Sequence, residues 1–198
     1  MLHADKFPGL CTPDESYHGI VYATQFGKGG AYITKATVQL MRDLGSIQSP
    51  QNSFLVNLGL ESLHVRMREH SKNGLAVAEF LAKHEKVQKV NYPGLKTDTY
   101  HSLAEKYMPN GCSGVVSFEI KGGREAAEKF MTSLKLIAIE THVADAKSCC
   151  LCPSITTHRQ LSDEQLVEAG VSAGLVRVSL GIEDAEDLIE DIRQALEA

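Results

Sequence analysis

From Val87 onward, short runs typical of strands lie between helical patterns, and where hydrophobic and polar residues alternate with a period of two the run predicts a strand with one buried face. The clearest run is SGVVSFEIK, and the others are VQKVNYPG, LIAIETHV, SCCLCPS and GLVRVSLGI. Helical patterns lie between these runs, in HSLAEKYM, in GREAAEKFMTSLK and in the amphipathic residues from 185 to the end. Because several connections are short, we expect an α/β domain close to the α+β type, with a mainly antiparallel sheet and helices on one face.

The first part of the chain lacks this alternation. Residues 1–30 show no period and contain Gly, Pro and Asp, so we expect an irregular connection there. Residues 31–45, AYITKATVQLMRDLG, predict a helix that ends at Gly45.

A longer helix is predicted to begin at Ser49 and Pro50, which suit a cap and a first helical position. It should continue to about Lys83 with a kink near Gly74, and it should be largely buried, because apolar residues occupy more than one of its sides. The predicted organisation is the end of a larger domain with its connection, a linking helix and a small C-terminal α/β domain, at residues 1–48, 49–84 and 85–198.

Composition limits the classes of function. Of the 198 residues 43% are hydrophobic and 23% are charged, which is typical of a soluble globular protein. The net charge of −5 and the lack of a basic block argue against a nucleic-acid partner, and we expect no membrane partner, because the chain shows neither a long apolar run nor a secretory signal. The five irregularly spaced cysteines then indicate reduced thiols and a cytoplasmic location.

Arg177 is the first candidate for chemistry, because it lies in the middle of an otherwise apolar strand. A period of two places it on the face opposite Val176 and Val178. A guanidinium group binds a carboxylate through two parallel hydrogen bonds, so an arginine fixed on a strand suits an amino-acid substrate. An ion pair with one of the 25 acidic residues is the alternative, and from the residues alone it is the more common arrangement.

The segment CLCPSITTHRQLS, from Cys150 to Ser162, is the second candidate. Its hydroxyl groups and imidazole, on Thr156, Thr157 and His158, could hold an anion. Turn and cap chemistry is the more common role for the two threonines.

Three cysteines close together raise the possibility of a metal or redox site. Cys149, Cys150 and Cys152 have His142 and His158 nearby in the sequence. Their spacing is not C-x-x-C, and strand alternation would point Cys149 away from the other two. We therefore expect small buried thiols and no metal.

Two further motifs are expected to be structural. GKGG at residues 27–30 lacks the spacing of a phosphate-binding loop and follows no clear strand, so a flexible turn is predicted. Lys35 could be read as a Schiff-base lysine, but it lies in an amphipathic helical pattern, where a solvated lysine is expected.

Several motifs, in order and with consistent spacing over nearly the whole chain, resemble the pyridoxal-phosphate enzymes of cysteine and methionine metabolism. The branch that they resemble most is that of the O-acetylhomoserine sulfhydrylases. The motifs run from FPGLCTPDESYHGIVY through SPQNSFLVNLGLESLHVRM, VNYPGL, DAKS and PSITTH to LVRVSLGIED.

The resemblance implies that this chain is the C-terminal part of such an enzyme. In the family the Schiff-base lysine, the phosphate-binding residues and the aromatic residue that stacks on the cofactor precede the region that FPGLCTPD matches. We therefore expect pyridoxal phosphate in the parent enzyme, and no catalytic or cofactor-binding residue within these 198 residues.

The resemblance also implies a ligand for Arg177. The arginine of LVRVSLG binds the substrate α-carboxylate in the family, and a second contact comes from the position that His142 occupies here. Ala144 stands where the family has glycine, and Ile155 stands where it has serine. The positions expected to line the same pocket are Val143, Ala144, Ser148 and Thr157.

The implied reaction of the parent enzyme makes homocysteine from O-acetylhomoserine and sulfide, or another thiol, by replacement at Cγ. The family is commonly tetrameric, so a homo-oligomer is expected, and the 198 residues alone should be inactive. A stand-alone module that binds an amino acid or a subunit partner without catalysis is the alternative.

Overall fold

The computed structural model describes residues 6–198, apart from the side chain of Asp163. The chain divides into two compact units, of which the first runs to Gly59 and the second is Leu60–Ala198. The predicted domain boundaries at residues 48 and 84 stay a prediction.

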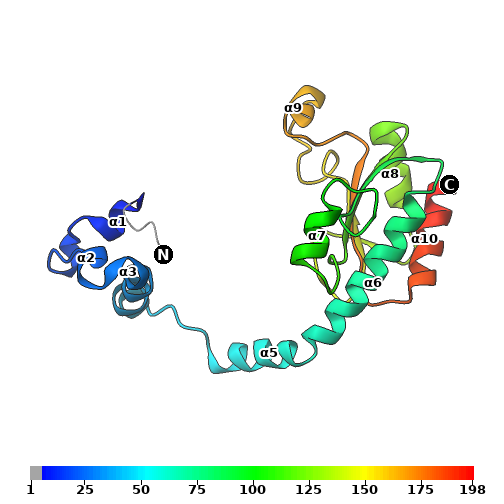
Figure 1. Cartoon of the computed structure of the whole chain (residues 1–198). Coiled ribbons are helices and arrows are strands. Elements are labelled where there is room, and N and C mark those ends of the chain that lie inside the picture. Colours follow the sequence, from blue (N-terminus) through cyan, green and yellow to red (C-terminus); the bar gives the residue numbers. More distant parts are fainter. Residues whose placement is uncertain (1–5) are drawn as a thin grey trace. The chain divides into compact units, whose positions relative to one another are not determined.

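Helices make up most of the first unit (Figure 1). Three short ones come first, and a continuous helical run then passes from α-helical to π-helical and back to α-helical geometry, ending at Gly45 with φ +66°. The elements are α1 (Pro8–Cys11), η2 (Glu15–Tyr17), α2 (Tyr22–Gln25), α3 (Gly27–Lys35), η3 (Ala36–Met41) and α4 (Arg42–Leu44).

The predicted helix ending at Gly45 is confirmed, whereas the irregular connection predicted for residues 1–30 is wrong over residues 6–30. The helices there have three or four residues, too few to show a helical period in the sequence. Residues 1–5 of that prediction lie outside the described residues. The flexible turn predicted for GKGG is also wrong, because these residues form the first turn of α3.

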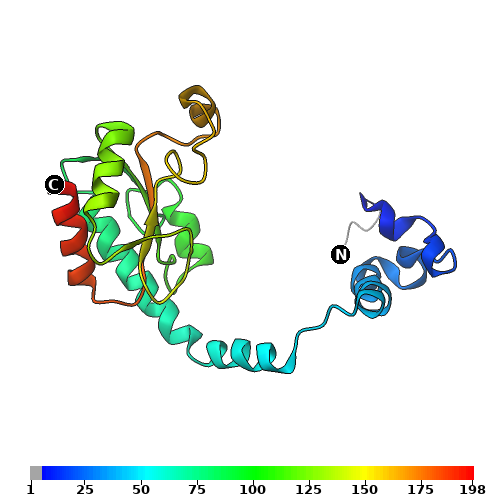
Figure 2. The same ribbon diagram turned by 180° about the vertical axis from the view of Figure 1, so that it is seen from behind.

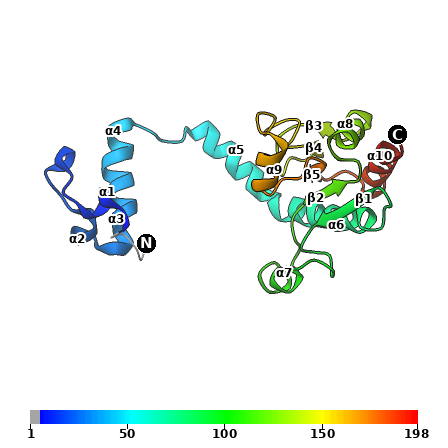
Figure 3. The ribbon, with the colours of Figure 1, turned by 90° about the horizontal axis from the view of Figure 1, so that it is seen from above.

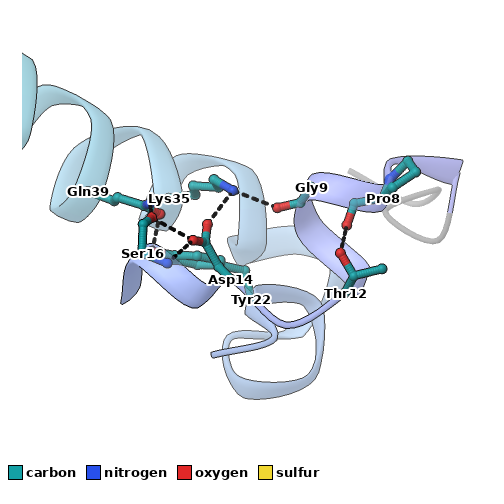
Figure 4. A network of polar contacts seen from close by, with 8 residues as sticks. All are labelled: Pro8, Gly9, Thr12, Asp14, Ser16, Tyr22, Lys35 and Gln39. Carbon is teal, nitrogen blue, oxygen red and sulfur yellow. Dashed lines mark hydrogen bonds and ion pairs between the residues drawn. The ribbon is translucent and has the colours of Figure 1, made fainter. Parts of the chain in front are cut away.

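Lys35 is not the solvated lysine that its helical pattern predicts. Its Nζ donates to Asp14 Oδ2 at 2.7 Å and to the Gly9 carbonyl at 2.8 Å (Figure 4). Ser16 Oγ donates to the other carboxylate oxygen of Asp14 at 2.6 Å, and Gln39 Nε2 donates to Ser16 Oγ at 2.7 Å. These contacts join the short N-terminal helices to the long helical run, over a small core of Leu10, Tyr22 and Ala31.

Helix α5 (Pro50–Glu61) begins as predicted, because Ser49 Oγ accepts a hydrogen bond from the backbone N–H of Asn52 at 3.2 Å. The predicted burial is wrong for α5, all of whose residues are exposed. The break between α5 and α6 (Leu63–Leu81) lies at Ser62 rather than at Gly74. Gly74 stays helical and allows close packing, because a Cβ there would lie 2.6 Å from the Ser113 carbonyl oxygen.

One five-stranded sheet organises the second unit, with the order β1-β2-β5-β4-β3 (Figure 3). Every pairing is antiparallel except that of β3 with β4, so the predicted mainly antiparallel sheet is confirmed. The strands are β1 (Val87–Asn91), β2 (Val115–Ile120), β3 (Ala138–Ile139), β4 (Cys149–Leu151) and β5 (Leu175–Ser179).

The helices α6, α8 (Gly123–Ser133) and α10 (Ala185–Glu197) gather on one face of this sheet (Figures 1 and 2). The core between them includes Phe118, Val176 and Val178, each fully buried, because alternate residues of β2 and β5 point to the same side. Two further helices complete the unit, namely α7 (His101–Tyr107) and α9 (Asp163–Glu168). None of the helices in the described part of the chain is long and apolar enough to cross a membrane.

Candidate functional site

Arg177 lies at the centre of β5, which is itself the middle strand of the sheet. It pairs with Ser117 of β2 on one side and with Leu151 of β4 on the other. Its neighbours Val176 and Val178 point into the helix-covered core, so Arg177 lies on the opposite face, as the alternation predicts.

The guanidinium group of Arg177 contacts carbonyl oxygens and no described carboxylate. Its Nη2 donates to the backbone carbonyls of Thr141 at 3.0 Å and of His142 at 3.4 Å. Its Nε is buried and has no hydrogen-bond partner among the described residues. The ion pair that was the alternative is therefore not formed with any described carboxylate, and the Nε–H is left as a buried donor without an acceptor among the described residues.

Residues 141–147 form an exposed loop between β3 and β4 that contacts Arg177 through its backbone. The side chain of His142 is 67% exposed, with Nε2 3.9 Å from Glu140 Oε2. Ala144 adopts φ +60°, a conformation that favours glycine, and its N–H donates to Ser179 Oγ at 3.0 Å. Val143 is exposed beside it.

Ser148 and Thr157, the other two pocket positions inferred from the resemblance, differ in their burial. Ser148 is buried, and its hydroxyl accepts from the Gly181 N–H at 2.7 Å and donates to Glu183 at 2.9 Å. Thr157 is exposed, with its hydroxyl 2.9 Å from His158 Nδ1. The structure thus places His142, Val143 and Ala144 in the loop that contacts Arg177, and it places Ser148 at the buried end of that loop, just before β4.

Turn chemistry explains much of the segment after β4. Thr156 Oγ1 donates to the Cys152 carbonyl at 2.8 Å, which confirms the structural role predicted for it. Ser154 is fully buried and donates to the Ala173 carbonyl at 2.8 Å, a contact that the sequence pattern did not reveal.

The cysteines of β4 point to both faces of the sheet, as predicted. Cys150 and Cys152 belong to the apolar core, whereas the Cys149 thiol donates to the His142 carbonyl at 3.1 Å. Burial raises the pKa of Cys149, and it raises the pKa of Cys150 to about 12, so both are unreactive thiols at neutral pH. Residues 6–198 contain no group of three His, Cys, Asp or Glu side chains arranged to hold a metal ion.

Glu183 is a residue beside the loop whose place the sequence did not predict. It lies just before Asp184, which caps the last helix, and it binds Ser148 through both carboxylate oxygens. His70 and Asn73, on the buried side of α6, contact the same segment. Polar residues on the apolar side of a helical pattern are the signal that could have identified these two.

Known proteins are similar to this chain in sequence and in fold. Residues 17–197 match the family model of the Cys/Met metabolism PLP-dependent enzymes. The chain is 46% identical to O-acetyl-L-homoserine sulfhydrylase of Leptospira meyeri and 43% identical to homocysteine synthase of Schizosaccharomyces pombe, over 96% and 98% of its own length. It covers 45% of each relative, so it spans about half of their length.

A solved structure gives the same result. The crystal structure of a putative O-acetylhomoserine (thiol)-lyase from Campylobacter jejuni, which contains N′-pyridoxyl-lysine-5′-monophosphate, matches with a TM-score of 0.84 and 39% identity. The match covers 98% of this chain and 46% of that one. The chain therefore belongs to the Cys/Met metabolism PLP-dependent enzymes.

Proposed function

We propose that this chain forms the part of an O-acetylhomoserine sulfhydrylase that binds the substrate α-carboxylate. The observation that carries the proposal is Arg177, which stands on the central strand with Nη2 fixed by two carbonyls and a buried Nε–H that lacks an acceptor. In the intact enzyme the Cγ–O bond of O-acetylhomoserine would break, a Cγ–S bond to sulfide would form, and homocysteine and acetate would leave. The names and 43–46% identity of the two relatives support this assignment.

Neither Arg177 nor the lysine that the sequence singled out is proposed to hold the cofactor. Pyridoxal phosphate, when bound in such an enzyme, stores electrons in its ring and is held by a lysine. Lys35, the lysine that the sequence singled out, is paired with Asp14 and the Gly9 carbonyl, so it does not fit that role. We therefore propose that residues 1–198 alone are inactive.

A planar guanidinium should orient the carboxylate through a pair of N–H groups, and the loop residues should set the width of the pocket. His142, Val143 and Ala144 are exposed on this loop and could contact substrate. Ser148 is buried, so it would affect substrate binding only by holding the loop in place. Thr157 is exposed in a different segment, and only a ligand larger than an amino-acid carboxylate would contact it as well as Arg177.

The test uses a chimera in which residues 1–198 replace the matching half of the Leptospira meyeri relative, with homocysteine formation as the readout. Arg177→Lys should raise the KM for O-acetylhomoserine by about tenfold to a hundredfold, because a point charge replaces a planar pair of donors. The KM for sulfide should not change. Arg193→Lys, on α10, is the matched control. Unchanged KM and kcat in Arg177→Lys would contradict the proposal, and so would activity of residues 1–198 alone.

The second candidate function is a stand-alone module that binds an amino acid or a subunit partner. The positive φ of Ala144, at a loop position where the resemblance implies glycine, favours a pocket that has diverged from the family's chemistry. If the chain is such a module, residues 1–198 should bind an L-amino acid or self-associate, and the chimera should be inactive. For the first candidate, the parent enzyme is proposed to be a cytoplasmic homo-oligomer.

A further inference from the structure

Glu183 connects the end of β5 to the loop over Arg177. Its carboxylate accepts two hydrogen bonds from Ser148, from the backbone N–H at 2.6 Å and from Oγ at 2.9 Å. Ser148 Oγ in turn accepts from the Gly181 N–H at 2.7 Å. These three bonds close a ring between Ser148, Gly181 and Glu183, and Ser148 is only 1% exposed.

The same segment is fixed from the other side by α6. His70 Nδ1 lies 2.6 Å from the Leu180 carbonyl oxygen, and Asn73 Nδ2 donates to the carbonyls of Gly181 at 3.1 Å and Glu183 at 2.8 Å. His70 and Asn73 are both buried, so the backbone after β5 is attached to the centre of the unit. Glu183 therefore presents its carboxylate from a rigid position.

The backbone packs too closely at Gly181 for another side chain. A Cβ at this position would collide with the Ala146 carbonyl and with the Glu183 carboxylate. The Ile182 N–H also donates to the Ala146 carbonyl at 2.9 Å. The loop and the segment after β5 thus form one packed unit at the Ser148 end of the loop.

The loop has few other attachments. All residues from Thr141 to Lys147 are exposed, and the loop is held near its start by the Cys149 thiol on the His142 carbonyl and by Arg177 itself. Ala144 keeps a left-handed conformation with one bond to Ser179. Loss of the Glu183 attachment should therefore loosen the loop without unfolding the sheet, because the backbone bond of Ile182 to Ala146 and the bond of Gly181 to Ser148 would still hold its end.

We propose that Glu183 is a positioning residue, which acts through Ser148 to hold the loop of residues 141–148 at the distance from Arg177 that an amino-acid carboxylate requires. The inference rests on the proposed function of Arg177. Glu183 itself touches neither substrate nor Arg177, and the loop backbone transmits its effect.

The first experiment is hydrogen exchange on residues 1–198. Glu183→Gln should speed exchange at the amides of residues 144–148 by about tenfold or more, the size expected when a charge-assisted hydrogen bond is lost, while the amides of β2 and β5 stay protected. Glu186→Gln, at an exposed residue in the first turn of α10, is the control and should leave the loop unchanged. Equal exchange in the two variants would overturn the proposal.

The second experiment measures kinetics in the chimera. Glu183→Gln and Ser148→Ala should each raise the KM for O-acetylhomoserine by about tenfold with little change in kcat or in the KM for sulfide. Combined with Arg177→Lys, the effect of Glu183→Gln should be much smaller than it is alone, because the two act on one carboxylate. Full additivity, or a fall in kcat alone, would show a merely structural role and overturn the proposal.

The two proposals can fail separately. An inactive unmodified chimera would count against the proposed function, and the exchange experiment would still decide whether Glu183 holds the loop. An active chimera in which Glu183→Gln behaves like Glu186→Gln would overturn the role of Glu183 alone.

Discussion

The two units are stabilised by different interactions: the first consists mainly of helices, and the second is a sheet with helices packed on one face. In the first unit three buried apolar residues, Leu10, Tyr22 and Ala31, are accompanied by a polar network centred on Asp14 and Lys35. The core of the second unit extends along β2 and β5 and over three helices. Apolar burial grows with the size of a core, so a small unit depends more on each polar contact. The comparison suggests that single substitutions should affect each unit through a different kind of interaction.

The largest expected effect tests the apolar core of the second unit. Phe118 is fully buried and meets Phe130 edge to face, with ring centroids 5.7 Å apart. Phe118→Ala should lower the free energy of unfolding of this unit by about 3–5 kcal/mol, because it removes apolar contacts and leaves a cavity. Urea denaturation followed by circular dichroism measures the loss. Val167→Ala, at a residue that is 72% exposed, should change stability by less than about 0.5 kcal/mol.

The next effect tests the polar network of the first unit. Asp14→Asn removes the charge that Lys35 and Ser16 bind, so the amides of α1 to α3 should lose protection from hydrogen exchange while β2 and β5 keep theirs. Asp43→Asn, at an exposed residue of α4, is the matched control. Unchanged protection in Asp14→Asn would show that the small apolar core suffices.

The pH dependence gives a second readout of the same network. Hydrogen bonds from Lys35 and Ser16 hold the pKa of Asp14 well below its usual value. A carboxylate with a lower pKa in the folded state stabilises the fold fully above the unfolded-state pKa of about 4, and this contribution is lost as the pH falls toward the folded pKa. The first unit should therefore begin to lose stability as the pH falls below about 4. Asp14→Asn should flatten this dependence, and Asp43→Asn should keep it.

Asp191 provides the corresponding case in the second unit. Burial tends to raise its pKa, but hydrogen bonds from the backbone N–H groups of Lys135, Leu136 and Ile137 outweigh burial and lower it. The second unit should thus also lose stability at acid pH, but its apolar core should keep it folded to a lower pH than the first unit. The order in which the two sets of amides exchange on acidification measures this difference.

The smallest effects come from two helical glycines. A Cβ on Gly74 would meet the Ser113 carbonyl, so Gly74→Ala should destabilise the second unit by about 1–3 kcal/mol despite the better helix propensity of alanine. A Cβ on Gly29 in α3 would have no atom within 4 Å, so Gly29→Ala should stabilise the first unit by up to about 1 kcal/mol. Thermal unfolding of both variants measures the two signs, and the same sign in both would contradict this packing argument.

The sequence predicted the second unit better than the first, for a physical reason. Alternation in β2 and β5 reflects burial on one face, so the strands, their antiparallel sheet and the position of Arg177 could be read from the residues. The contacts of Asp14 with Lys35 join residues 21 positions apart, and no local pattern encodes such a contact. Helices of three or four residues are likewise defined by what they pack against.

The candidate site divides in the same way. That Arg177 faces away from the core follows from alternation, whereas the residues alone left its partner open and the proposal that it binds a carboxylate depends on the resemblance. The attachment of Ser148 to Glu183 could not be predicted, because it links residues 35 positions apart through a turn. A charged residue just before the cap of a helix is ordinarily exposed, so the identity of residue 183 did not indicate a contact with a buried serine.

The π-helical segment η3 bears on how this protein could change in length. A π-helical turn contains more residues than an α-helical one, so it absorbs one extra residue while the helix on either side keeps its orientation. Deleting one residue elsewhere in the run would turn everything beyond it by about 100°. Related chains that differ by a single-residue gap in this helix should therefore carry it between Ala36 and Met41. That gap would move Gln39 away from Tyr22 and Ser16 and leave the ends of the helix in place.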